Sequence, residues 1–265
     1  PPGLHHVLNE SEIPINPRSS AALDFAVVRL GAHEVVKDTD AREGAWVLIS
    51  GSALLTYDQQ TVRVARRNVF DEPPTTLHLG PQTPLTIAGG DDGAEFAVVR
   101  TENDRRFPSR LFLATEITPE FRGAGLVQGA CLRNVRLVFD RAARPDSNLV
   151  VGEVVNYPGK WSSYPPHHHD QPEIYHYRFT DARGYGHAEV GEEVAKVRHG
   201  DTVFIPPGLD HGQVSAPGYG MYYLWMIRHL PGNPYTGFTF AEEHQWTLDG
   251  RQQGWIPKDV PTSTP

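Results

Sequence analysis

The feature that most constrains the fold is a series of short runs rich in Val, Ile, Leu, Tyr and Phe, each bounded by Gly, Pro, Asp or Asn. Such runs are typical of β-strands joined by tight turns. Long segments with a 3.6-residue apolar period are scarce, and the best helix candidates are brief turns near Thr118–Phe121 and Phe240–Gln245. The pattern therefore predicts an all-β sandwich or barrel. The main predicted strands are Phe25–Leu30, Trp46–Tyr57, Thr61–Phe70, Glu95–Arg100, Val135–Phe139, Leu149–Val155, Ile174–Phe179, Thr202–Ile205 and Met221–Ile227.

Composition and charge exclude several classes of protein. A chain of 265 residues with 39% hydrophobic content can bury one large β core or two of ordinary size. A net charge of −8 disfavours binding to nucleic acid. The only cysteine, Cys131, excludes an intramolecular disulfide, and no N-terminal apolar segment is long enough for a signal peptide or membrane span. We therefore expect a cytoplasmic protein with neither nucleic-acid nor membrane partners.

A weak internal repeat indicates how the strands are divided. The run from Val69 to Pro74, followed by His78, parallels the run from Val203 to Pro207, followed by His211. Because the two copies lie about half a chain apart, the repeat predicts two similar β-barrels in tandem. The boundary is expected within Arg122–Asp146, which gives an N-terminal barrel over residues 1–130 and a C-terminal barrel over residues 131–265.

The second half contains histidines at spacings that a metal ion can use. Alternate side chains of a strand share a face, so His167 and His169 are expected to point the same way while His168 points out. A turn at Asp170–Pro172 can return Glu173 to that face. His211 follows a second strand and a Pro-Gly turn, and would complete the site.

The predicted ligands are therefore His167, His169, Glu173 and His211. Two or three imidazoles with one carboxylate suit a single divalent ion of Zn, Mn, Fe, Co or Ni, with Zn or Mn preferred, and leave open positions for a substrate.

The first half lacks the same pair of histidines. When Glu43 is set against Glu173, Lys37 and Thr39 stand where His167 and His169 would be. We therefore expect the N-terminal barrel to bind no metal. His78 is then expected to be structural, and Lys37 could form a salt bridge with Glu43.

The motifs H-x-H-x3-E and P-x-G-x-x-H resemble the two motifs of cupins, which are double-stranded β-helix barrels. More specifically, the stretches Trp161–Asp170, Glu173–Phe179 and Ala216–Leu224 resemble the 5-deoxy-glucuronate isomerases of inositol breakdown. The resemblance extends through Arg67–Phe70, Arg122–Gly125 and Pro145–Ser147, and so covers most of the chain.

This resemblance implies a tandem cupin (bicupin) and a metal-dependent aldose–ketose isomerase that converts 5-deoxy-D-glucuronate to 5-dehydro-2-deoxy-D-gluconate. Two features depart from the family: His168 stands where Lys or Arg is usual, and the stretch between Asp170 and Glu173 is short. The short stretch resembles the related 5-keto-4-deoxyuronate isomerase of pectin breakdown, which is the alternative substrate assignment.

Strand alternation from Glu173 places Tyr175 and Tyr177 on the cavity side, with His176 and Arg178 facing away. Tyr175, Tyr177 and Tyr223 are the catalytic candidates, although aromatic core packing explains them equally well. The substrate carboxylate needs a cation, and Arg178 and Lys160 are candidates because they lie near the motifs.

Two other classes fit the same residues. Cupins with three His and one Glu can hold Fe or Cu and use dioxygen, and a non-catalytic sugar-sensing barrel is also possible. Neither has the support of the long isomerase-like motifs. The Pro- and aromatic-rich segment Phe238–Trp255 is compatible with a homo-oligomer, whose copy number the sequence does not fix.

Overall fold

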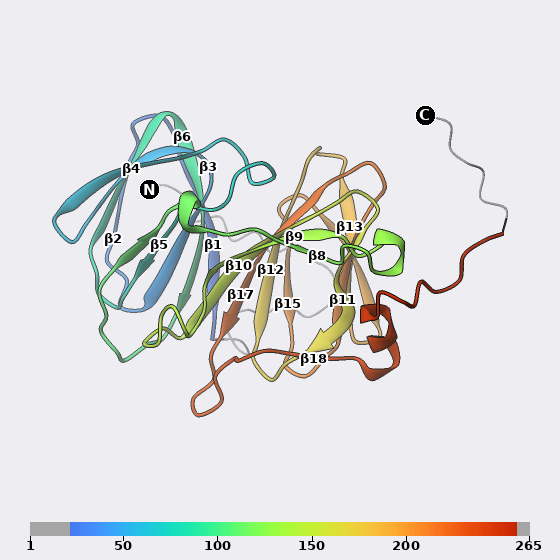
Figure 1. Ribbon diagram of the computed structural model, residues 1–265. Helices are drawn as coiled ribbons and strands as arrows, with labels where there is room; N and C mark the ends of the chain where they lie inside the picture. Colours follow the sequence, from blue (N-terminus) through green and yellow to red (C-terminus); the bar gives the residue numbers. More distant parts are fainter. Residues whose placement is uncertain (1–21, 259–265) are drawn as a thin grey trace.

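A computed structural model describes residues 22–258; residues 1–21 and 259–265, the outer ends of the two predicted barrels, lie outside the described residues. The described part contains 18 strands and short 3-10 helices, divided between two halves that lie side by side (Figure 1). The prediction of an all-β chain is confirmed. The 3-10 helices are η1 (Ala114–Glu116), η2 (Val127–Gly129) and η3 (Glu242–Leu248).

The N-terminal half is built on a seven-stranded sheet in the order β1-β6-β3-β5-β7, with β2 added to β6 and β4 added to β3. Its longest strands, β3 and β6, bend back over the sheet at register shifts near Gly51. A side chain at Gly51, whose φ is +87°, would collide with the carbonyl of Gly93. The strands are β1 (Asp24–Leu30), β2 (Val35–Asp38), β3 (Glu43–Tyr57), β4 (Gln60–Arg66), β5 (Thr76–Leu79), β6 (Leu85–Thr101) and β7 (Arg110–Phe112).

The C-terminal half consists of two facing sheets. One has six strands in the order β15-β12-β17-β10-β9-β8, and the other has five in the order β14-β13-β16-β11-β18. The strands are β8 (Glu120–Arg122), β9 (Arg133–Phe139), β10 (Leu149–Asn156), β11 (Trp161–His168), β12 (Glu173–Phe179), β13 (Tyr185–Val190), β14 (Glu193–Arg198), β15 (Thr202–Ile205), β16 (His211–Ser215), β17 (Met221–Arg228) and β18 (Thr239–Phe240).

The two halves share a topology, in agreement with the sequence repeat. The order β1-β6-β3 in the first half matches β10-β17-β12 in the second. Glu43 begins β3 and pairs with Thr101 of β6, and Glu173 begins β12 and pairs with Ile227 of β17. The two glutamates therefore occupy equivalent places in the two barrels.

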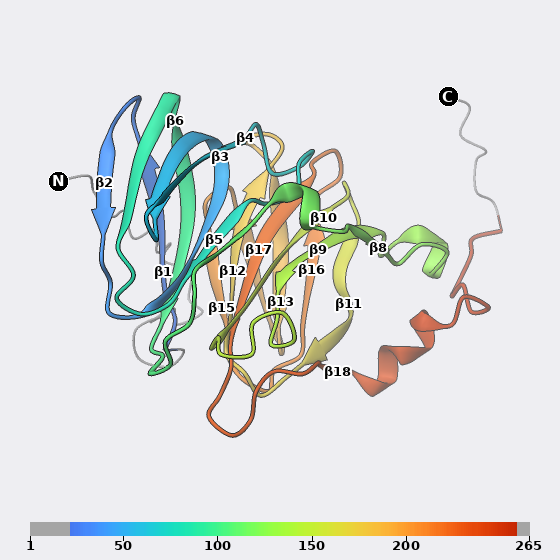
Figure 2. The same ribbon diagram turned by 60° about the vertical axis from the view of Figure 1, so that its left-hand side comes forward.

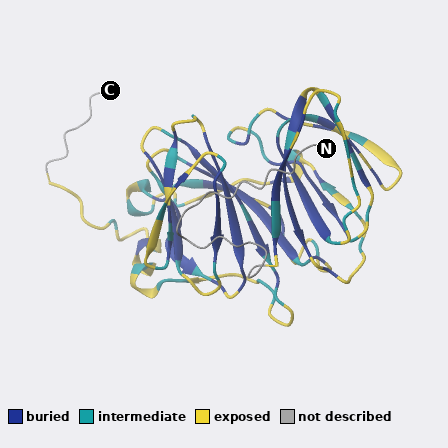
Figure 3. Ribbon diagram, turned by 180° about the vertical axis from the view of Figure 1, so that it is seen from behind, coloured by how far each residue is buried: buried dark blue, intermediate teal, exposed yellow. Residues whose placement is uncertain are grey.

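Three apolar clusters form the core, and most strands are buried along much of their length (Figure 3). One cluster fills the N-terminal barrel and includes Trp46 and Phe96. Another lies between the seven-stranded and six-stranded sheets, and joins Val47 to Phe139 and Leu224. The third fills the space between the two C-terminal sheets. The six-stranded sheet is therefore covered on both faces.

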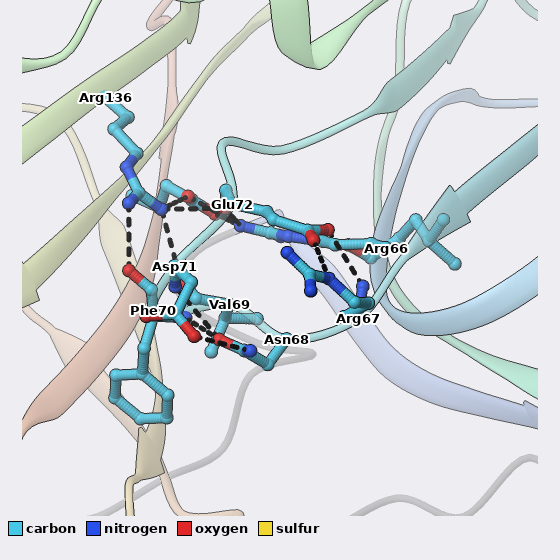
Figure 4. Close-up of polar contacts among 10 residues, drawn as sticks. Arg66, Arg67, Asn68, Val69, Phe70, Asp71, Glu72 and Arg136 are labelled. Atoms are coloured by element: carbon cyan, nitrogen blue, oxygen red, sulfur yellow. Dashed lines mark hydrogen bonds and ion pairs between the residues drawn. The ribbon is translucent and has the colours of Figure 1, made fainter.

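A buried ion cluster also joins the halves. Glu153 of β10 is fully buried and lies 2.8 Å from Arg66 and 2.9 Å from Arg136. Arg136 also donates hydrogen bonds to the carbonyls of Val69 and Phe70, in the loop that Figure 4 shows beneath its guanidinium group. The Arg67–Phe70 stretch noted in the sequence thus presents backbone carbonyls to an arginine of the other half.

Of the two predicted helical turns, the structure contains one. The prediction at Thr118–Phe121 is wrong, because the chain there enters strand β8, which pairs with β9. The turn predicted at Phe240–Gln245 corresponds to η3, displaced by two or three residues. Beyond η3 the chain leads away from the barrels (Figure 2), and Trp255 is 83% exposed. Among residues 22–258, no helix combines the length and the apolar character needed to cross a membrane.

Replacing Glu153 with Gln should destabilise the protein by about 3–5 kcal/mol, because Arg66 and Arg136 would keep buried charges without a counterion. The free energy of unfolding can be measured by denaturant titration. Asp181→Asn, which breaks an exposed pair with Arg183, is the control and should change the midpoint little. Equal effects of the two substitutions would show that the cluster does not hold the halves together.

Candidate metal centre

The predicted ligands come together inside the C-terminal barrel. His169, Glu173 and His211 form a buried group whose ligand atoms lie within 4.8 Å of one another. His167 adjoins this group, with its ring centroid 4.4 Å from that of His211. The end of β11, the start of β12 and the turn that connects them across the two sheets supply His167, His169 and Glu173, and His211 begins β16. The structure thus brings all four residues to one place, with three of them in the tightest cluster.

The hydrogen bonds within the group leave lone pairs available. The His211 Nδ1–H donates to the Leu209 carbonyl at 3.1 Å, so its Nε2 carries a lone pair and lies 3.4 Å from Glu173 Oε2. Nε2 of His169 is 3.1 Å from the same oxygen. Buried ring nitrogens of His167, His169 and His211 have no hydrogen-bond partner among the described residues. Unpaired nitrogens around one carboxylate are the donor set expected for a divalent ion.

Burial and mutual contacts set the protonation of this group. Burial opposes the charge of Glu173, but the hydrogen bond from His169 and the proximity of His211 outweigh it and lower its pKa to about 2. Burial, with the nearby His211, lowers the pKa of His167 to about 3. At neutral pH the group therefore presents an ionised carboxylate and a neutral His167 imidazole, which are the forms that bind metals.

The local backbone explains which side chains point inward. His168 faces outward, as expected from strand alternation, and its Nδ1 lies 2.7 Å from Asp210. Between Ser162 and His167 the pairing of β11 with β16 is interrupted, so β11 advances five positions while β16 moves from Gln213 to His211. Such an irregularity redirects side chains. It allows Ser163 and His167 to line the same cavity.

A cavity of about 180 Å³ opens beside the ligands. Tyr235 and Phe238, from the chain after β17, border it; their rings lie 5.1 Å from His169 and 4.2 Å from His167, respectively. The cavity thus combines an aromatic border with polar groups converging on one side, as small-molecule sites do. The polar residues of its wall are Arg122, Arg133, Asp140, Ser163, His167, His169 and Glu173, together with Tyr175, Tyr223 and Tyr235.

Two of the three predicted catalytic tyrosines line this cavity. Tyr175 and Tyr223 stack with ring centroids 4.6 Å apart, and both are in its wall. The hydroxyl of Tyr223 is 2.5 Å from Ser162 Oγ and 3.2 Å from Ser163 Oγ. Tyr177 lies deeper, and its hydroxyl donates to Gln213 at 2.5 Å. Burial raises the pKa of Tyr175 and of Tyr223, so both are neutral phenols at physiological pH.

The structure does not bring Arg178 or Lys160 to the cavity. Arg178 lies on the opposite face of β12, where its guanidinium bonds to Glu95 of the N-terminal half at 2.6 Å. Lys160 lies in the turn before β11, outside the cavity wall. The cations in the wall are instead Arg122 and Arg133. Sequence reasoning missed Arg133, although alternation back from Val135 places it on the same face as the cavity-lining Val135.

The equivalent place in the N-terminal half has a different set of contacts. Glu43 Oε1 accepts a hydrogen bond from His78 Nε2 at 2.8 Å and another from Ser147, while Asn148 donates its backbone N–H to Oε2. Arg144 donates to the remaining ring nitrogen of His78 at 2.8 Å. Both lone-pair sites that a metal would use are therefore occupied by protein groups. The expected salt bridge to Glu43 from the exposed Lys37 is wrong: in the described structure, the side-chain partners of Glu43 are His78, Ser147 and Asn103.

The duplicated barrels and the buried His and Glu cluster define a tandem cupin with a candidate metal site, and the predicted fold class is confirmed. Oxalate decarboxylase from Lactobacillus farciminis shares this fold, with a TM-score of 0.63 and 14% identity over 86% of this chain and 81% of that chain. The sequence profile of the KduI/IolB family matches residues 5–247, and the chain belongs to this family.

Relatives with assigned names agree with this placement. The 5-deoxy-glucuronate isomerase of Geobacillus kaustophilus is 28% identical over 235 residues, which cover 81% of each chain. That of Shouchella clausii is 27% identical and covers 85% of this chain and 88% of the relative. The crystal structure of an IolB-like protein from Salmonella typhimurium has a TM-score of 0.78 and 26% identity over 86% of this chain and 90% of that chain. The predicted enzyme class, an isomerase, is confirmed.

Purified protein loaded with Zn²⁺ or Mn²⁺ should retain about one ion per chain after dialysis, because one set of ligands has free lone pairs. His211→Ala should lose most of this metal. His78→Ala, at the equivalent place in the other half, should retain it. Metal content can be measured by plasma mass spectrometry; equal loss in both variants would contradict the assignment to the C-terminal barrel.

Proposed function

We propose that this chain is a metal-dependent aldose–ketose isomerase of inositol catabolism that converts 5-deoxy-D-glucuronate to 5-dehydro-2-deoxy-D-gluconate. The proposed location of this reaction is the cytoplasm. The observation that carries the proposal is the buried group His169, Glu173 and His211, with His167 beside it. His167, His169 and Glu173 lie in the wall of a small-molecule cavity. The relatives named 5-deoxy-glucuronate isomerase support the choice of substrate.

His167, His169, Glu173 and His211 would hold one divalent ion, with zinc or manganese as the preferred metal. When bound, such an ion acts as a Lewis acid that polarises a carbonyl and stabilises the negative charge that develops on neighbouring oxygens. The protein contributes the placement of its ligands. The Leu209 carbonyl fixes the tautomer of His211, and the start of β12 places Glu173 between two imidazoles.

The hydroxyl groups of the cavity wall are proposed to handle the proton that moves between the two sugar oxygens. Tyr175, Ser163 and Tyr223 form a chain with separations of 3.4 Å and 3.2 Å, and Ser162 continues it at 2.5 Å. Each hydroxyl can both donate and accept a hydrogen bond. Because the phenols are neutral, they act by donating to an oxygen that becomes negative, rather than as phenolate bases.

A second substrate is favoured by one observation. The stretch between Asp170 and Glu173 is short, as in the related isomerase of 5-keto-4-deoxyuronate. That sugar also carries a carboxylate and undergoes the same class of ketol isomerisation. Substrate competition distinguishes the two assignments, because the true substrate should compete at lower concentration.

The proposal can be tested by proton NMR in D₂O with metal-loaded protein and 5-deoxy-glucuronate. We expect the ketose signals to appear, the C2 proton signal to disappear, and both changes to stop after a strong chelator is added. Failure of fully metal-loaded protein to convert this sugar, with conversion of the 5-keto-4-deoxyuronate, would replace the first substrate by the second. Oxygen consumption in place of isomerisation would reject both.

Tyr223→Phe should lower kcat by about 100-fold or more, because a positioned proton donor contributes on that order to the rate. Tyr177→Phe is the matched control: it removes an equally buried hydroxyl that bonds to Gln213 beneath the cavity, and should leave kcat within a few-fold of the parent. Steady-state kinetics on metal-loaded variants would decide this. Equal kcat values for the two variants would remove Tyr223 from the reaction.

A further inference from the structure

We propose that Arg133, in the wall of the cavity beside the metal ligands, is the cation that binds the carboxylate of the substrate. The inference rests on the proposed function for the identity of the sugar, but the subsite itself is argued from the contacts of Arg133. Arg133 begins β9, where it pairs with Asn156 of β10 and with Arg122 of β8. Its side chain forms part of the same cavity wall as His167, His169 and Glu173.

The charge of Arg133 is not balanced by the protein. The four most buried arginines, Arg66, Arg100, Arg136 and Arg178, each lie within 3.3 Å of a carboxylate oxygen. Arg133 donates one hydrogen bond, to the Cys131 carbonyl at 2.9 Å, and between residues 22 and 258 no carboxylate lies within the 4.0 Å of an ion pair. Arg133 is half-buried, and a guanidinium that is partly removed from water is stabilised when a ligand supplies a counterion.

The other cation of the wall is already paired. Arg122 is 45% exposed and donates two hydrogen bonds to Glu120, at 2.7 Å and 2.9 Å. Of the two cations in the wall, Arg133 is therefore the one with donors free for an anion.

The position of Arg133 relative to the ligands suits a bifunctional substrate. Its side chain lines the same cavity as His167, Tyr175 and Tyr223. Ser163 and the two tyrosines thus lie in the wall shared by the cation and the metal ligands. An open-chain uronate has its aldehyde and hydroxyl at one end and its carboxylate at the other. A guanidinium can bind that carboxylate through two parallel hydrogen bonds while the reacting carbons face the ligands.

The subsite can be tested by calorimetric binding of D-glucuronate and D-glucose to the metal-loaded protein, two sugars that differ in the carboxylate. Wild type should bind glucuronate more tightly than glucose. Arg133→Gln should weaken glucuronate binding by about 10- to 100-fold, the effect of one charge-assisted hydrogen-bonding partner, and leave glucose binding unchanged. Arg110→Gln removes the same charge from an exposed pair in the N-terminal half and should change neither affinity.

Arg133→Lys provides a second reading if the Gln variant does not fold. It keeps the charge but loses the paired donors, so glucuronate binding should weaken several-fold with no effect on glucose. The proposal is overturned if wild type shows no preference for glucuronate, or if neither substitution at Arg133 changes that preference.

Turnover of 5-deoxy-glucuronate separates this proposal from the proposed function. In one outcome, wild type converts the sugar and Arg133→Gln raises KM by about 10- to 100-fold with little change in kcat. The contact with the carboxylate then stabilises the bound substrate and the transition state equally, as inferred. If wild type binds glucuronate through Arg133 but isomerises nothing, the subsite stands and the proposed reaction fails. If wild type isomerises and the KM of Arg133→Gln is unchanged, the reaction stands and the subsite fails.

Discussion

The site depends on the alternation of side chains along β12, in a sheet that is covered on both faces. Glu173, Tyr175 and Tyr177 point toward the five-stranded sheet, and the residues between them point toward the N-terminal half. On that second face, Ile174 enters the shared apolar core and Arg178 bonds to Glu95. A shift of one residue would exchange the two faces. The N-terminal half therefore sets which residues of β12 reach the cavity.

The same duplicated position is used in two ways, and hydrogen-bond partners account for the difference. In the C-terminal barrel, the Nδ1–H of His211 donates a hydrogen bond to a backbone carbonyl. The Nε2 of His211, which lies near Glu173, therefore keeps its lone pair. In the N-terminal barrel, His78 donates a hydrogen bond to the carboxylate of Glu43 and accepts a hydrogen bond from Arg144. Ser147 and Asn148, in the loop between β9 and β10 of the C-terminal half, donate further hydrogen bonds to Glu43. One barrel position thus binds a loop of the other half, and the other presents a donor set to a ligand.

The sequence predicted the features that follow from local spacing. Short apolar runs predicted the all-β class. The motif H-x-H-x3-E predicted that His167, His169 and Glu173 lie together, because strand alternation and one turn are enough to bring them to one face. The distant motif P-x-G-x-x-H added His211. The cation of the cavity could not be found in this way. Arg133 is 34 residues before His167 in the chain, and reaches the cavity only because β9 is the third strand from β12 across the sheet. Proximity in sequence pointed instead to Arg178, whose partner Glu95 is in the other half.

Several buried charged groups outside the cavity are matched by oppositely charged side chains or by hydrogen-bond donors. Glu153 is matched by Arg66 and Arg136, Arg178 by Glu95, and the carboxylate of Glu43 by four hydrogen-bond donors. Each of these groups is fixed by protein partners, as buried polar groups generally are. Three incomplete groups lie in the wall of one cavity: ring nitrogens of His167 and His169 without a hydrogen-bond partner, and the guanidinium of Arg133 without a carboxylate. Since leaving such groups unpaired costs stability, their concentration in one place indicates that binding, rather than folding, is what they serve.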